Sequence, residues 1–151
     1  VLTPDFKGYR PALERVFNTI PDIFSHNVEC VERISRKVRS QANWERSIDI
    51  LRQSAEFGLY TKTGIMVGLG ENFDEVVNTM KEIRKSGVSI FTIGQYLQPT
   101  KENLPVQRYV SNDEFETYKR IGLYLGFDIV ESGPLVRSSY HADEQARLAL
   151  D

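Results

Sequence analysis

The sequence predicts an α/β protein with a parallel sheet, because short apolar runs alternate with segments of helical periodicity. The 151 residues suffice for one domain with its own core. A closed eight-stranded barrel usually needs at least ~200 residues, so we expect either part of a parallel barrel or a small doubly wound domain. Residues 1–3 resemble the end of a strand and include no initiator Met, which favours an internal start and the partial barrel.

The composition is that of an ordinary globular protein, with 40% hydrophobic residues, 26% charged residues and a formal net charge of −2. It predicts no broad attraction to nucleic acid or membrane. Cys30 is the sole cysteine, so these residues alone cannot build an internal disulfide, a four-thiolate zinc site or a cysteine-bound cluster. A local basic cluster is expected to form a solvated helix face; it comprises Arg33, Arg36, Lys37 and Arg39.

Capping residues and glycines mark the expected helices. Three helices each have a polar N-cap candidate before them and a glycine after them; the pairs are Asn43 with Gly58, Asn72 with Gly87, and Ser111 with Gly126. Ser111 and Glu114 also have the spacing of a capping box. An earlier helix is expected over residues 9–20, with Pro11 near its first turn and Ile20 on its apolar face.

Four short apolar runs predict the strands, at residues 22–26, 63–67, 89–94 and 127–130. In both candidate architectures, ligands bind at the carboxyl ends of parallel strands. The residues that follow the first three strands are unusually polar. We therefore expect a binding site along this edge of the sheet.

Asn27 and Glu29 follow the first strand, where side chains two positions apart can grip a pair of hydroxyls, as on a ribose. The alternative is that Asn27 caps a helix and Glu29 is exposed. The two glycines within residues 68–71 permit either close backbone approach to a ligand or a tight turn. Gln95 and Tyr96 could contact a base, or Tyr96 could simply be buried at the strand end.

A tail over residues 133–142 gathers hydrogen-bonding side chains with no amphipathic period; they are Arg137, Ser138, Ser139, Tyr140 and His141. Loops with so many donors commonly bind ligands, so we expect the tail to serve the active site rather than the core. The alternative is a surface turn that caps a final helix near residues 143–150. A hydrolase pair of Ser139 and His141 is disfavoured, because the sequence has neither a nucleophile elbow nor an obvious orienting Asp.

Five long blocks, in order, resemble lipoyl synthase, a family of radical S-adenosylmethionine enzymes; they are residues 2–6, 26–29, 63–71, 92–99 and 133–144. The resemblance implies that residues 1–151 are the C-terminal half of a partial TIM-type barrel. That single domain would lack the N-terminal cluster-binding part and would include an active-site tail over residues 132–151.

The resemblance also implies a sulfurtransferase that inserts sulfur at carbons six and eight of a protein-bound octanoyl group. Its cofactors would be S-adenosylmethionine and two four-iron, four-sulfur clusters, whose cysteine ligands lie outside this chain, so the chain alone would be inactive. Implied partners are an octanoylated lipoyl-carrier domain or glycine cleavage H protein, and ferredoxin or flavodoxin as electron donor. Its compartment would be the cytoplasm, or the mitochondrion in a eukaryote.

For the site, the resemblance implies that Ser139 ligates an iron of the second cluster and that Arg137 holds the tail or balances charge. The residues implied for S-adenosylmethionine are Asn27 and Glu29 for the ribose, Arg39 and Lys62 for the methionyl carboxylate, and Gln95, Tyr96 and Leu97 for the adenine. A different class of function is a stand-alone module that binds S-adenosylmethionine or an acyl-carrying domain without catalysis.

Overall fold

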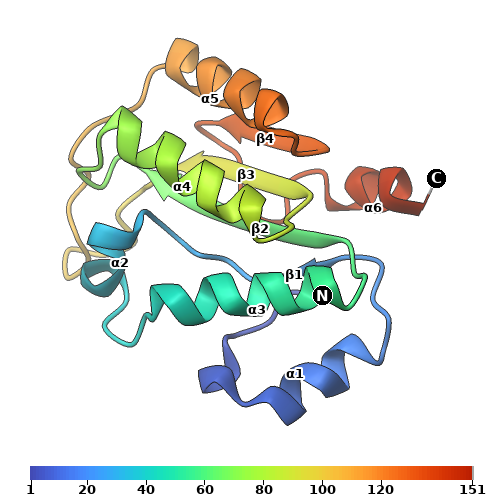
Figure 1. The fold of residues 1–151 in the computed structure, drawn as a ribbon. Coiled ribbons are helices and arrows are strands. Elements are labelled where there is room, and N and C mark those ends of the chain that lie inside the picture. Colours follow the sequence, from blue (N-terminus) through green and yellow to red (C-terminus); the bar gives the residue numbers. More distant parts are fainter. Residues whose placement is uncertain (151) are drawn as a thin grey trace.

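The computed structural model describes residues 1–150 and is built on one four-stranded sheet in which every neighbouring pair of strands is parallel. The strands are β1 (Phe24–Ser25), β2 (Thr61–Val67), β3 (Ile90–Gln95) and β4 (Ile129–Gly133). Their order in the sheet is β1-β2-β3-β4, the same as in the chain (Figure 1). This order has no reversal point, so the arrangement is that of a barrel segment and not of a doubly wound sheet.

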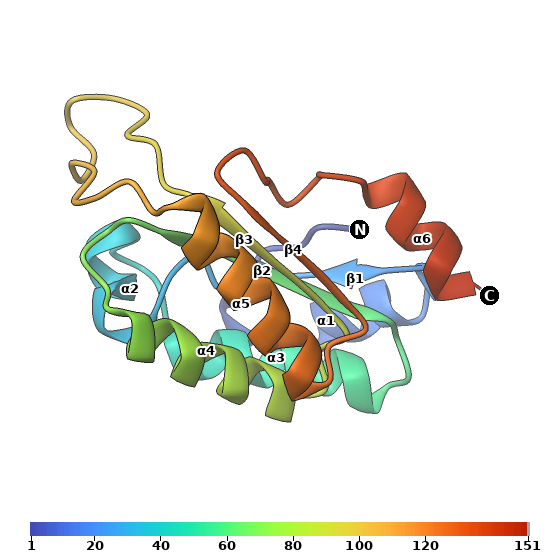
Figure 2. The same ribbon diagram turned by 90° about the horizontal axis from the view of Figure 1, so that it is seen from above.

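The helices are α1 (Arg10–Phe17), α2 (Glu32–Val38), α3 (Trp44–Glu56), α4 (Phe73–Lys85), α5 (Asn112–Leu125) and α6 (Ala142–Leu150), with a short 3-10 turn over Phe6–Gly8. Helices α1 to α5 lie on one side of the sheet, whereas the tail and α6 lie on the other side (Figure 2). Right-handed crossovers between successive parallel strands produce this one-sided layer. The second face of the sheet therefore corresponds to the interior of a barrel.

The main core lies between the sheet and helices α2 to α5, where apolar side chains of β2 and β3 such as Val67, Phe91 and Ile93 are fully buried. A smaller cluster fills the space between α1, α3 and β1 around Leu13 and Phe24. None of the helices described between residues 1 and 150 combines the length and apolarity needed to cross a membrane.

Residues 1–3 extend the sheet beyond β1. The Ser25 amide donates to the Val1 carbonyl at 2.8 Å, and the Thr3 amide donates to the Ser25 carbonyl at 2.8 Å. Leu2 and Ser25 thus form a parallel bridge. The strand-like character expected for these residues is confirmed.

Most helix signals are confirmed. Asn43 and Asn72 cap α3 and α4, and Gly126 ends α5 in the left-handed conformation. The expected extent of the first helix was wrong. It ends at Phe17, and Ile20 lies outside it with a positive φ and 75% exposure.

Other differences concern local details, among them the last strand, which runs over Ile129–Gly133 and not over residues 127–130. The first strand is limited to Phe24–Ser25, and α2 is a regular helix that the sequence suggested only through its basic face. Ser111 caps α5, but the Glu114 carboxylate does not complete a capping box. It instead accepts two hydrogen bonds from Arg108 and one from Tyr118, because the guanidinium offers a stronger, charge-assisted bond.

Candidate functional site

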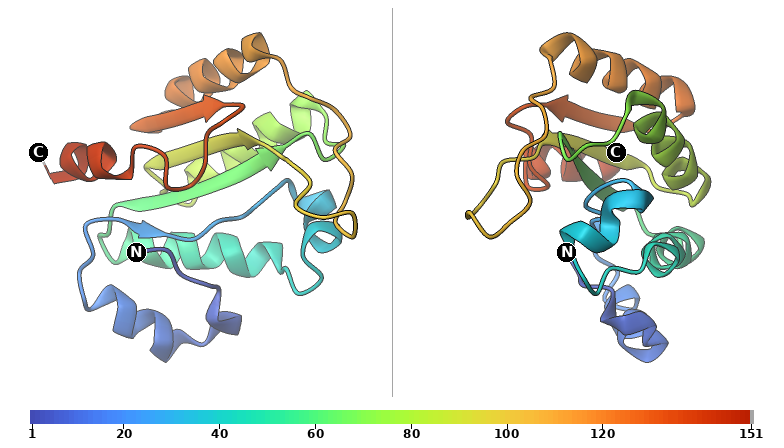
Figure 3. Two further views of the ribbon diagram at one scale, coloured as in Figure 1. Left: turned by 180° about the vertical axis from the view of Figure 1, so that it is seen from behind. Right: turned by 90° about the vertical axis from the view of Figure 1, so that its left-hand side faces the viewer.

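A small cavity of about 110 Å³, here called the strand-end cavity, lies between the sheet and the tail. It is lined by Asn27, Glu29, Gly64, Ile65, Met66, Thr92, Gly94, Val136, Arg137 and Ser138. Figure 3 shows the tail leaving β4 and running back over the interior face of the sheet towards α6. The structure therefore brings Asn27, Glu29 and Arg137 together, although they come from opposite ends of the chain.

Asn27 and Glu29 are fixed by the backbone that follows β1. The Glu29 amide donates to the Gly64 carbonyl, and the Glu29 carbonyl accepts from the Met66 amide at 2.8 Å. This pairing holds Glu29 at a φ of 78°, a conformation that costs free energy for a residue other than glycine. Val31, not Asn27, is the N-cap of α2, so the helix-capping alternative for Asn27 is wrong.

Asn27 and Glu29 both have unused capacity to bind a polar ligand. The Oδ1 atom of Asn27 is buried and has no hydrogen-bond partner among the described residues. Burial raises the pKa of the Glu29 carboxyl, and the Arg39 guanidinium partly opposes that shift. Because an unpaired buried oxygen is costly, its presence here is the clearest local sign of a missing partner.

Arg39 lies beside the same pair. A cavity of about 220 Å³ is lined by Arg39, Asn27 and Glu29 together with His26 and residues 2–4. His26 is 1% exposed, and its ring nitrogens bond to the Thr3 carbonyl and the Ser47 hydroxyl. His26 thus ties residues 1–3 and α3 to the end of β1, which positions Asn27.

The tail approaches the sheet at Gly94, where it contacts backbone rather than side chain. A β-carbon at this position would lie 2.2 Å from the Val136 carbonyl oxygen. Arg137 is exposed, and its guanidinium donates to the Val136 carbonyl at 2.7 Å. Glycine on β3 is thus required for the tail to lie against the interior face.

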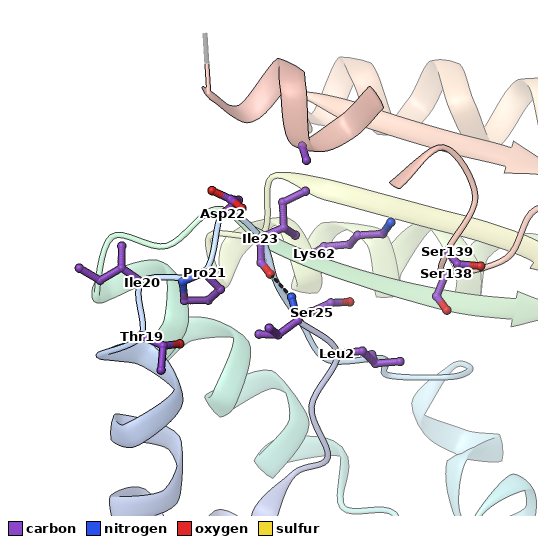
Figure 4. Close-up of a pocket in the computed structure, with 12 residues that line it drawn as sticks. Leu2, Thr19, Ile20, Pro21, Asp22, Ile23, Ser25, Lys62, Ser138 and Ser139 are labelled. Atoms are coloured by element: carbon purple, nitrogen blue, oxygen red, sulfur yellow. Dashed lines mark hydrogen bonds between the residues drawn. The ribbon is translucent and has the colours of Figure 1, made fainter. Parts of the chain in front are cut away.

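A larger cavity of about 650 Å³, here called the tail cavity, lies between the tail, α6 and the first residues of the chain (Figure 4). Its lining includes residues 1 and 2, residues 19–23, and Ser25, Lys62, Ser138, Ser139 and Ala146. Ser138 lines both this cavity and the strand-end cavity. Ser139 is exposed and faces the same space as Lys62 (Figure 4).

Two side chains, Lys62 on β2 and His141 in the tail, have hydrogen-bond partners that were not among the sequence-based expectations. Lys62 is 3% exposed, and its ammonium donates to the Gln145 side chain at 2.6 Å; burial lowers its pKa. His141 bonds to Glu144, which raises the pKa of the imidazole. His141 is thus paired with a carboxylate three residues away, a spacing that was visible in the sequence.

Gln95, Tyr96 and Leu97, which are expected on the adenine side, line neither the strand-end cavity nor the tail cavity. The Gln95 amide bonds to the backbone of Tyr96, Arg108 and Val110, and the Tyr96 hydroxyl donates to the Leu104 carbonyl. Leu97 is 47% exposed. The side chains of Gln95 and Tyr96 therefore hold the loop after β3 in place, and of the three expected residues Leu97 has the exposed side chain.

The glycine-containing turn after β2 is closed by its own acidic residue. The Glu71 carboxylate accepts from the amides of Gly68 and Leu69 at 2.6 and 2.9 Å. Both glycines of this turn have positive φ. The tight-turn alternative is favoured, because the amides that a ligand would need are already occupied.

The donors on this chain fit the two expected kinds of cofactor differently. Asn27 and Glu29 fit a nucleoside, since an orphaned oxygen and a half-buried carboxyl suit a pair of hydroxyls. Within residues 1–150, no group of three His, Cys, Asp or Glu side chains could hold a metal ion. Cys30 is buried, and burial raises the pKa of its thiol to about 12. These residues alone do not fit an iron–sulfur cluster.

Comparison with known proteins assigns the chain to a family. Residues 1–83 match the radical SAM superfamily, and the chain belongs to that superfamily. Membership implies chemistry with S-adenosylmethionine and iron–sulfur clusters. The parallel sheet with one outer layer of helices is a partial barrel of this superfamily.

Within the superfamily, the chain is similar to lipoyl synthases. It is 55% identical to the lipoyl synthase of Rubrobacter xylanophilus over 147 residues, which cover 96% of this chain and 46% of the relative. It is 51% identical to the lipoyl synthase of Parabacteroides distasonis, covering 95% and 51%, respectively. It is 50% identical to the mitochondrial lipoyl synthase of Nematostella vectensis, covering 95% and 50%. The chain spans about half the length of these relatives.

Proposed function

We propose that this chain forms the C-terminal half of the catalytic barrel of a lipoyl synthase, which inserts sulfur at carbons six and eight of a protein-bound octanoyl group. The observation that carries this proposal is the path of the tail. It crosses the interior face of the sheet against Gly94 and reaches the cavity that contains Asn27 and Glu29. Ser138 lines that cavity, and Ser139 lines the adjoining tail cavity.

The proposed contacts to S-adenosylmethionine follow the order of the strands. Asn27 and Glu29 would bind the ribose, since both line the strand-end cavity and the Oδ1 atom of Asn27 has no partner among the described residues. Arg39 would pair with the methionyl carboxylate, whereas Lys62, also expected there, is bonded to Gln145 instead. Residues 95–97 would lie on the adenine side, with the exposed Leu97 side chain against the base. When bound, S-adenosylmethionine and the clusters would supply hydrogen abstraction from the octanoyl chain and the sulfur inserted there.

The tail would contribute Ser139 as an oxygen ligand to an iron of the second cluster. The exposure of Ser139 on the interior side of the sheet supports this role, because a cluster held by cysteines from elsewhere could approach it. An alkoxide is a weaker partner than a thiolate for a soft metal, which suits a ligand that must be released. Arg137, bonded to the Val136 carbonyl, would hold the tail or balance the charge of the cluster.

The proposal extends to partners and compartment. The acyl substrate would be carried by a lipoyl-carrier domain or by glycine cleavage H protein, and electrons would come from ferredoxin or flavodoxin. The net charge of −2 suits a protein that binds neither nucleic acid nor membrane. The enzyme would work in the cytoplasm, or in mitochondria in a eukaryote.

The alternative is a stand-alone binding module for S-adenosylmethionine or an acyl-carrying domain. One observation favours it: Asn27 and Glu29 provide a polar site, whereas residues 1–150 provide no metal site. The two functions differ in the effect of adding an N-terminal segment that carries the clusters. A binding module gains no activity from that segment, whereas an enzyme becomes active.

The test joins the chain to an N-terminal half that carries the cysteine ligands of both clusters and reconstitutes the clusters without oxygen. An octanoylated carrier protein is then incubated with S-adenosylmethionine and a reductant, and mass spectrometry follows the lipoyl product. The proposal predicts product from the joined protein and none from the chain alone. A cluster-loaded protein that cleaves S-adenosylmethionine but forms no lipoyl product would reject it. Asn27→Ala is expected to weaken S-adenosylmethionine binding, with Asn78→Ala, on the exposed face of α4, as the matched control.

A further inference from the structure

Lys62 is a buried cation on the interior face of the sheet. It is the second residue of β2, and it shares a row with Ile90 and Ile129 on the neighbouring strands. Its side chain is 3% exposed, and no carboxylate among the described residues forms an ion pair with it. A buried ammonium is costly unless hydrogen-bonded. The acceptor seen in the structure is the Oε1 atom of Gln145, at 2.6 Å.

Gln145 connects this lysine to the tail. It lies on α6 and is 1% exposed. Its Oε1 atom accepts from Lys62, and its Nε2 atom donates to the Tyr140 carbonyl at 3.2 Å. Both ends of the amide are therefore used. Since Tyr140 follows Ser139 in the chain, one side chain links the sheet to the turn that carries the proposed ligand.

The rest of the tail is weakly attached to the sheet by comparison. Leu135 is 78% exposed, Tyr140 is 41% exposed, and the Arg137 side chain donates to the carbonyl of its neighbour Val136. The contact at Gly94 fixes Val136, three residues before Ser139. The second fixed point is therefore the amide of Gln145. In Figure 4 the Lys62 side chain extends from β2 towards the serines of the tail.

We propose that Gln145 is a positioning residue, which, anchored on Lys62, holds the turn at Tyr140 so that Ser139 stays beside the interior face. The inference rests on the proposed function, because Ser139 has a task only if that function holds. It also gives Lys62 a role other than the contact with the methionyl carboxylate that the family resemblance implies. Lys62 anchors the tail. It lies three residues before Ile65, which pairs with Glu29, so Lys62 and the Glu29 position are ~10 Å apart along the strand.

The chemistry explains why the linking residue is an amide. The contact requires one acceptor for the ammonium and one donor for the Tyr140 carbonyl, and glutamine offers both at the same distance from the backbone. Glutamate keeps the acceptor and loses the donor. Leucine loses both while filling a similar volume. These two substitutions therefore separate the halves of the link.

The experiment uses the complete, cluster-reconstituted enzyme with Gln145→Leu, Gln145→Glu, Lys62→Met and the control Gln41→Leu, whose side chain is exposed. Hydrogen exchange reports the amides of residues 138–145, and calorimetry reports S-adenosylmethionine binding. In Lys62→Met, exchange should rise about tenfold, the effect of losing one ordinary hydrogen bond; in Gln145→Leu, which removes both bonds and leaves the buried ammonium without its acceptor, it should rise further. The affinity for S-adenosylmethionine should be unchanged in all variants, and amide exchange should be unchanged in the control Gln41→Leu. In Gln145→Glu, which keeps the contact with Lys62, the rise should be confined to residues 139–141.

Two results would overturn the proposal: unchanged exchange in Gln145→Leu, or a loss of S-adenosylmethionine affinity in Lys62→Met with the tail still protected. The second result would indicate that Lys62 binds the methionyl carboxylate, as the family resemblance implies. Exchange and binding need no turnover, so these outcomes stay informative if the wild-type enzyme forms no lipoyl product. That failure would count against the proposed function and not against the link between Lys62 and Gln145.

Discussion

Replacing Gly94 with alanine should release the tail from the sheet. The added β-carbon would lie 2.2 Å from the Val136 carbonyl oxygen and 3.2 Å from an Arg137 guanidinium nitrogen. The oxygen belongs to the backbone, so no change of rotamer can relieve the overlap. Extra volume in a packed site costs about 1–3 kcal/mol. Since β3 is paired on both sides, the tail is the part that moves.

The size of the effect follows from that cost. Losing about 1–3 kcal/mol of tail docking multiplies the open population by roughly 5 to 150, and amide exchange in the tail rises by the same factor. The amides to follow are those of Val136 and Tyr140, which bond within the tail. The free energy of global unfolding should fall by less than the tail docking energy, because the ladder between β2 and β3 stays intact.

Gly133→Ala is the matched control. Gly133 pairs with Gly94 in the sheet, but a β-carbon there meets only a Val136 methyl group at 3.5 Å, an ordinary contact. Exchange in this variant should stay near that of the wild type. Equal exchange in both variants and the wild type would refute the close approach of the tail to β3.

Two further predictions concern titratable groups. Hydrogen bonds from Arg33 and the Asn72 amide lower the pKa of Glu75 to about 2, so its ionised form stabilises the fold. That stabilisation is complete above the ordinary pKa of 4.5 and is lost as the pH falls towards about 2. The stability of Glu75→Gln should therefore fall less between these pH values than that of the wild type. Identical profiles of stability against pH in the two proteins would contradict the prediction. Burial raises the pKa of the Cys30 thiol to about 12, so iodoacetamide should alkylate it only after unfolding; rapid labelling of the native protein would disprove that burial.

The sequence predicted those parts of the fold that depend on neighbouring residues. Asn43 and Asn72 cap helices through bonds to amides three residues away, and Gly126 supplies a left-handed helix end. The same logic failed at Glu114, because Arg108 competes for its carboxylate. It failed at Ile20, because apolar periodicity continued past the point where the backbone leaves the helix.

The candidate site was predictable to the extent that strand ends meet at one edge. That rule placed Asn27 and Glu29 beside a cavity. It did not indicate that the Gln95 side chain is occupied by the backbone of residues 108–110, since these residues come together through a loop without regular structure. Lys62 and Gln145 lie 83 positions apart, and no local pattern joins them. Such contacts depend on the tertiary path of the tail.

The most direct test of the central claim is Ser139→Ala in the complete enzyme, with the exposed Ser40→Ala as the matched control. Both S-adenosylmethionine cleavage and lipoyl formation are measured in the same reaction. Ser139→Ala should keep cleavage and lose sulfur insertion, whereas Ser40→Ala should keep both. Undiminished lipoyl formation in Ser139→Ala would contradict the assignment of the tail to the active site.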